Sequence, residues 1–181
     1  MENFFLKSKH WQLFLIFFIL MFVCQISFLL QIELNESIDF FGLQTAVFMG
    51  CFLSWFYFLI IGLNNKIKNE NLKANTRNLL FLIIFPILYI LIAFTIFPSG
   101  FNISTEGDSD ADPIWLLVMF PVHFFSMFCI FYLIYKAAKT IKVAEVQKPV
   151  KFVDFAGEFF LLWFFPIGIW FLQPKINKLA E

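Results

Sequence analysis

His123 is the residue of this sequence best suited by type to do chemistry inside a hydrophobic segment. An imidazole titrates near neutral pH, so it can accept, donate or pass on a proton. His123 lies in a long uncharged stretch, and an ionisable side chain in such a stretch is a functional candidate by default. Pro121 and Pro86 each free a backbone carbonyl that needs another partner. The pattern predicts a polar site at membrane depth.

Four further polar side chains are expected at a depth similar to that of His123. Counted at about 1.5 Å per residue from the outer ends of the predicted helices, all five lie roughly 10 to 16 Å deep. The five residues are Gln25, Cys51, Ser54, Tyr89 and His123. This layer is either a small proton- or ligand-binding pocket or a set of interhelical hydrogen bonds, each worth around 0.6 kcal/mol. We expect the hydrogen-bond layer, because similar depth alone does not make residues face one another.

Asp108, Asp110 and Asp112 stand at alternate positions, a spacing that resembles the start of a calcium-binding loop. A complete loop of this kind has glycine at its sixth position and glutamate at its twelfth, where this sequence has Pro113 and Met119. The predicted role is therefore a solvated acidic loop, with at most weak metal binding.

The sequence lacks the common catalytic and cofactor motifs. It contains no H-E-x-x-H, G-x-S-x-G, P-loop or G-x-G-x-x-G sequence. Its two histidines, His10 and His123, are expected at different depths, so a haem held by both within one chain is not expected. No carboxylate lies inside an apolar segment, which argues against conventional ion-coupled transport. We expect no cofactor and no enzymatic activity.

Four apolar segments must position these side chains, and none of them contains Lys, Arg, Asp or Glu: residues 11–32, 43–63, 79–97 and 114–135. Each has about the 20 residues that a helix needs to cross a hydrocarbon core of roughly 30 Å. Continuous apolarity excludes the alternating pattern of barrel strands. The chain is 14% charged, against about 25% in soluble domains. The predicted fold is an all-α integral membrane bundle of four transmembrane helices, in a single domain of residues 1–181.

The loops between these segments alternate in charge sign. All 13 Lys and Arg residues lie in the N-terminal segment, the second loop or the region after the fourth apolar segment. The first and third loops carry acids without any base. The positive-inside rule therefore predicts a cytoplasmic N-terminus. The excess of Lys over Arg, with abundant Phe, Ile and Asn, is typical of an AT-rich bacterial genome, so we expect a bacterial inner-membrane protein.

The C-terminal region allows two arrangements. Residues 149–158 are predicted to form an amphipathic helix with three charges on one face: Lys151, Asp154 and Glu158. Residues 159–172 form an apolar run of 14 residues that contains Pro166 and Gly168. A run of 10–14 residues is more typical of a re-entrant or interfacial segment than of a span. Trp163 and Trp170 would nevertheless suit either membrane interface, so a fifth span stays open.

Ala46, Gly50 and Ser54 are spaced by four residues in the second apolar segment. Small residues at this spacing let two helices approach closely. We expect a tight contact here, either within the bundle or between subunits.

Lys136, Lys139 and Lys142 continue the fourth predicted helix at a spacing of three. Their expected role is to anchor this end of the helix through anionic lipid headgroups. A surface for a partner protein is the alternative.

The C-terminal segment WFFPIGIWFLQPKIN, residues Trp163–Asn177, is similar to the C-terminus of small multi-pass membrane proteins of Bacteroidota. The similarity implies a bacterial source and no particular activity.

We expect a non-enzymatic protein that acts through assembly, as an accessory subunit or as a homo-oligomer. One alternative is an oligomeric channel or small-solute transporter, with a path lined by Gln25, Ser54, Tyr89 and His123. A second is a membrane-embedded enzyme acting on lipids or quinones. The expected partners are the lipid bilayer and a membrane protein or second copy, and no nucleic acid.

Overall fold

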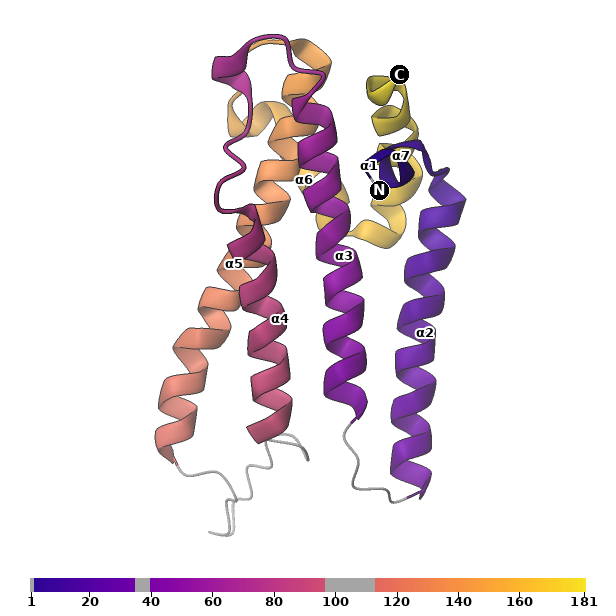
Figure 1. Ribbon diagram of the computed structural model, residues 1–181, viewed down its shortest axis with the longest axis vertical. Helices are drawn as coiled ribbons and strands as arrows, with labels where there is room; N and C mark the ends of the chain where they lie inside the picture. The colour runs from indigo at the N-terminus through magenta and orange to yellow at the C-terminus, as the bar shows by residue number, and fades with distance from the viewer. Residues whose placement is uncertain (1, 35–39, 97–112) are drawn as a thin grey trace.

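The structure, a computed structural model, describes residues 2–34, 40–96 and 113–181, and all regular elements there are helical (Figure 1). In chain order they are α1 (Glu2–Lys7), α2 (His10–Leu34), α3 (Phe40–Asn64), the 3-10 helix η1 (Glu70–Leu72), α4 (Leu79–Ile96), α5 (Pro113–Val146), α6 (Phe152–Trp163) and α7 (Phe165–Ala180). Helices α2 to α5 each contain a stretch long and apolar enough to cross a membrane. The predicted all-helical class with four such helices is confirmed.

Helix α3 is the central element of the fold. It contacts α1, α2, α4, α5 and α7, and Figure 1 shows it between α2 and α4. Half of its apolar stretch is buried, against 17% in α2, 22% in α4 and 28% in α5. Most side chains in the apolar stretches of the other three long helices are therefore not fully buried within the single chain.

Aromatic rings join α3 to α2 and α7. Phe17 of α2 lies 5.7 Å from the Trp55 ring of α3 and 5.9 Å from the Phe165 ring of α7, between centroids. Phe52 of α3 lies 4.9 Å from Phe165. Phe17 and Trp55 are almost fully buried. Large rings at these distances bury much apolar surface and add a favourable ring-ring interaction.

The N-terminal helix α1 is held by α7. Gln173 is fully buried, and its Nε2 donates to the carbonyl oxygens of Phe5 at 2.8 Å and Ser8 at 3.1 Å. Asn177 donates to the same Ser8 oxygen at 3.2 Å. These bonds satisfy carbonyls at the end of α1, which have no partner inside a helix of six residues.

The positively charged segments meet at one end of the molecule, called here the basic end. It comprises α1, the α3–α4 loop (residues 65–78), residues 136–151 and the last two turns of α7; Figure 1 shows these segments together in the upper part of the view. The backbone N–H of Lys68 donates to Gln147 at 3.0 Å, and the Lys136 ammonium donates to the Asn75 carbonyl at 2.7 Å. The first and third loops lie largely outside the described residues.

Helices α6 and α7 form a hairpin that turns at Phe164, and α7 runs back toward the basic end (Figure 1). Pro166 lies in the first turn of α7, where a missing N–H costs nothing. A Cβ atom on Gly168 would overlap the carbonyl of Leu161, so glycine is what allows this close approach. Neither helix has a stretch that meets the length needed for a span.

Helix α6 begins later than the amphipathic segment predicted over residues 149–158. Its first residue is Phe152, because Asp154 accepts a hydrogen bond from the Lys151 N–H at 2.7 Å and so caps the helix there. Glu158 is also less exposed than Lys151 and Asp154, which the sequence places with it on one helix face. Its side chain is 12% exposed and accepts a hydrogen bond from Lys175 of α7 at 2.8 Å.

Candidate functional site

Tyr89 and His123 form the one contact that the structure shows between members of the predicted polar layer. The Tyr89 hydroxyl of α4 lies 3.0 Å from Nδ1 of His123 on α5. One turn along α4, the Phe85 ring meets Phe125 of α5 edge-on, with centroids 4.8 Å apart. This ring contact fixes the two antiparallel helices beside the polar pair.

His123 is exposed on the surface of the single chain, and Tyr89 is half-buried. In a neutral imidazole one ring nitrogen donates and the other accepts. If Nδ1 accepts from the Tyr89 hydroxyl, Nε2 carries the proton. No hydrogen bond joins Nε2 to any group within residues 2–34, 40–96 and 113–181. The pair therefore presents the ring nitrogen Nε2, which can form one more hydrogen bond, to whatever surrounds the chain.

The other members of the layer are arranged differently. Ser54 donates to the Gly50 carbonyl of its own helix at 2.6 Å, so its hydroxyl already has a partner. Gln25 and Cys51 are exposed. In the part of the chain that the structure describes, none of these three residues bonds to Tyr89 or His123. Among the described residues, the predicted layer is thus one bonded pair and three polar groups that do not bond to it.

The small-residue stripe of α3 faces α4 within the same chain. Ala46 is 5% exposed, and a Cβ atom on Gly50 would lie 3.7 Å from Ile87 Cδ1 of α4. Since 3.7 Å is an ordinary van der Waals distance, the helices are not at their closest possible approach there. The stripe therefore lies against α4 at an ordinary packing distance, and the tight contact expected from the sequence, within the bundle or between subunits, stays a prediction.

The predicted acidic loop with Asp108, Asp110 and Asp112 lies outside the described residues. Among the residues that are described, no group of three or more His, Cys, Asp or Glu side chains could hold a metal ion.

Sequence reasoning missed a cluster of four charges at the basic end. Glu145 accepts hydrogen bonds from Lys142 and Lys175, each at 2.8 Å, and Glu158 lies 2.8 Å from Lys175 and 3.8 Å from Lys142. Burial lowers the pKa of Lys175, but its hydrogen bonds to both glutamates raise that pKa further, so the net shift is upward. The Lys142–Glu145 pair is visible in the sequence as an i, i+3 spacing, whereas the contacts between helices are not.

No protein-family model, curated protein or solved structure matches this chain significantly. The function must therefore be argued from the residues and their geometry.

Proposed function

We propose that this protein acts through assembly in the membrane, with copies of itself or with another membrane protein. The observation that supports this proposal is the exposed His123, whose Nε2 has no partner in the described part of the chain. Ionisable side chains at membrane depth almost always face a bundle interior, a water-filled cavity or each other. Lipid tails offer no hydrogen bond, so a neighbouring helix with an acceptor would be favoured beside His123.

A second copy of this chain could supply that acceptor. Gln25 is exposed on α2 at a depth similar to that of His123, and only 17% of the apolar stretch of α2 is buried. Hydrogen bonds between membrane helices contribute around 0.6 kcal/mol on average and up to about 2 kcal/mol. Together with close packing of apolar side chains, one such bond is enough to bias which helices meet.

We also propose the orientation and the setting of the protein. The N-terminus and the whole basic end lie in the cytoplasm, following the positive-inside rule, and the membrane is the inner membrane of a bacterium. The α6–α7 hairpin enters the membrane from the cytoplasmic side and returns to it. Its support is that Lys151, before α6, and Lys178, in the last turn of α7, then lie on one side.

The role of His123 in assembly is tested by two matched variants. His123→Leu removes the exposed donor, whereas Tyr89→Phe removes the bond inside the chain and keeps the imidazole. The proposal predicts that His123→Leu lowers the fraction of chains crosslinked in membranes by several-fold while the yield of folded protein is kept. Tyr89→Phe should change that fraction much less. Equal crosslinking in both variants and the wild type would show that His123 has no part in assembly.

A further inference from the structure

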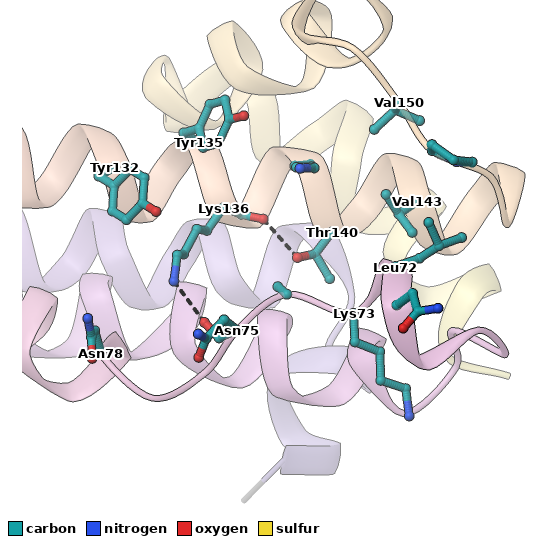
Figure 2. A pocket seen from close by; sticks show the side chains of 14 residues that line it. Leu72, Lys73, Asn75, Asn78, Tyr132, Tyr135, Lys136, Thr140, Val143 and Val150 are labelled. Atoms are coloured by element: carbon teal, nitrogen blue, oxygen red, sulfur yellow. Dashed lines mark hydrogen bonds between the residues drawn. The ribbon is translucent and has the colours of Figure 1, made fainter.

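A groove of about 460 Å³ opens at the basic end, between the α3–α4 loop and helix α5. Figure 2 shows the loop residues Asn75 and Asn78 opposite Tyr132 and Lys136 of α5. Three lysines and no carboxylate line it: Lys73, Lys136 and Lys139. The groove is therefore a positively charged concave site with amide and hydroxyl groups in its wall.

Hydrogen bonds from two side chains hold the α3–α4 loop, which forms one side of the groove. Asn64, which is 7% exposed at the end of α3, donates to the Ala74 carbonyl at 2.9 Å and accepts from the Ala74 N–H at 3.0 Å. Gln147, just past α5, bonds the backbone of Lys66 and Lys68 at 3.2 and 3.0 Å. These contacts hold the loop in place without a ligand, which lowers the cost of ordering it on binding.

The three lysines of the groove differ in whether their ammonium groups already have an ion-pair or hydrogen-bond partner. Lys73 pairs with Glu70 at 2.6 Å, and Figure 2 shows its side chain directed away from Lys136. Lys136 extends across the groove, donates to the Asn75 carbonyl at 2.7 Å and keeps two further N–H donors. Lys139 is exposed and has no partner among the described residues. Two ammonium groups can therefore bind an anion.

A stripe of stacked rings on α5 leads from membrane depth to this groove. Phe128 stacks on Tyr132 at 5.8 Å with an angle of 7° between the rings, and Tyr132 stacks on Tyr135 at 6.1 Å and 8°. Phe128 is 58% exposed and Tyr132 is 39% exposed, so the stripe lies on the outer surface of the helix. An acyl chain can pack along such a stripe.

We propose that this groove binds the phosphate group of an anionic phospholipid, with an acyl chain along the stripe of Phe128, Tyr132 and Tyr135. Lys136 and Lys139 supply charge-assisted hydrogen bonds to the phosphate oxygens. Asn75 uses its side-chain oxygen to accept from the Arg77 N–H at 2.9 Å, which leaves its amide NH₂ as a further donor. Soluble phosphate monoesters also carry a phosphate group, but they have no acyl chain that could pack along the stripe.

The test is a titration of the full-length protein in mild detergent with phosphatidylglycerol or phosphatidylcholine, counting bound lipids by native mass spectrometry. We expect Lys136→Gln combined with Lys139→Gln to weaken phosphatidylglycerol binding roughly thirtyfold, at about 1 kcal/mol per charge near the surface. Lys139→Gln alone should weaken it about fivefold and leaves the Lys136–Asn75 bond intact. The matched control is Lys148→Gln, which removes one exposed charge at the same end outside the groove; it should change binding by less than about twofold.

Three results would overturn the proposal. Equal binding of phosphatidylglycerol and phosphatidylcholine would show that the negative charge of the lipid plays no role in binding. Equal losses in Lys139→Gln and Lys148→Gln would show a diffuse basic surface instead of a groove. Displacement of the lipid by millimolar glycerol 3-phosphate would assign the groove to a soluble ligand. Preference for phosphatidylglycerol that is lost in the groove variants and unaffected by glycerol 3-phosphate would support it.

Discussion

Gln173 is a single residue that joins two segments lying far apart in the sequence. Its fully buried amide lies on α7 and bonds two carbonyls of the N-terminal segment, Phe5 and Ser8. Gln173→Leu removes the donor to the Phe5 oxygen, whereas the Ser8 oxygen keeps its bond from Asn177, and a buried polar group without a partner costs about 1 to 3 kcal/mol. We expect a lower melting temperature in detergent and faster proteolysis of the N-terminus.

Asn177→Leu is the matched control for Gln173→Leu, because it removes a longer and less buried bond to the same Ser8 oxygen. Its effect should be the smaller of the two. Melting curves for Gln173→Leu that superimpose on those of the wild type would show that the bonds of Gln173 to the N-terminal segment do not stabilise the fold.

Lys175 gives the fold a predicted dependence on high pH. The pKa of Lys175 is raised in the folded protein above its ordinary 10.5, because its bonds to Glu145 and Glu158 outweigh the effect of burial. A group with a raised folded pKa stabilises the protein fully below the unfolded pKa and loses this contribution as pH rises through the folded pKa. The stability difference between wild type and Lys175→Met should therefore be constant between about pH 7 and pH 10 and shrink above pH 10. A difference that stays constant through pH 12 would exclude this linkage.

The sequence identifies single candidate residues better than it predicts which other residues they contact. His123 is conspicuous because an imidazole in an uncharged apolar stretch is costly. Its contact with Tyr89 depends on the relative register of α4 and α5, which no local pattern encodes. Glu158 is a similar case, because its partner Lys175 lies 17 residues away on another helix.

Helix α7 depends on one glycine for its position against α6. A Cβ atom on Gly168 would overlap the carbonyl of Leu161, and a backbone carbonyl cannot move aside as a side chain can. Gly168→Ala should therefore destabilise the protein by more than about 1 kcal/mol, by separating the two helices. Thermal unfolding and the yield of monodisperse protein measure this effect.

Gly157→Ala is the control for Gly168→Ala, since a Cβ atom at Gly157 meets nothing within 4 Å. Alanine is the better helix former by about 1 kcal/mol, so this variant should be neutral or slightly stabilising. Similar destabilisation by both substitutions would refute the close approach at Gly168.

The long helices were predictable because the requirement of a membrane-spanning segment is simple: about 20 apolar residues without charge. Helices α2 and α3 contain the first two predicted segments with ends that differ by one to three residues, α4 covers residues 79–96 of the third, and α5 contains the fourth but continues 11 residues beyond it to Val146. The apolar run at residues 159–172 was ambiguous, because 14 residues fit a short span as well as a re-entrant turn. The hairpin follows from tertiary contacts, such as those of Phe165 with Phe17 and Phe52.

For the whole molecule, we predict that both chain ends lie in the cytoplasm. Single cysteines introduced at Lys148 and Lys178 should react with a membrane-impermeant maleimide only after the membrane is opened, because both lie at the basic end. A cysteine at Asp108 should react in intact cells. The native cysteines, which lie in α2, α3 and α5, set the background. Reaction at Lys178 in intact cells would show that the C-terminal segment crosses the membrane.

We propose above that the protein acts through assembly, because polar side chains of its long apolar helices are exposed and little of α2 is buried. The most direct measurement is the native mass of the wild-type complex, isolated in mild detergent from the cells in which the protein naturally occurs. We predict a discrete mass larger than that of one 21.4 kDa chain. This mass should be either a multiple of the chain mass or the sum of the chain and one defined membrane protein. A mass of one chain at every detergent concentration would contradict it.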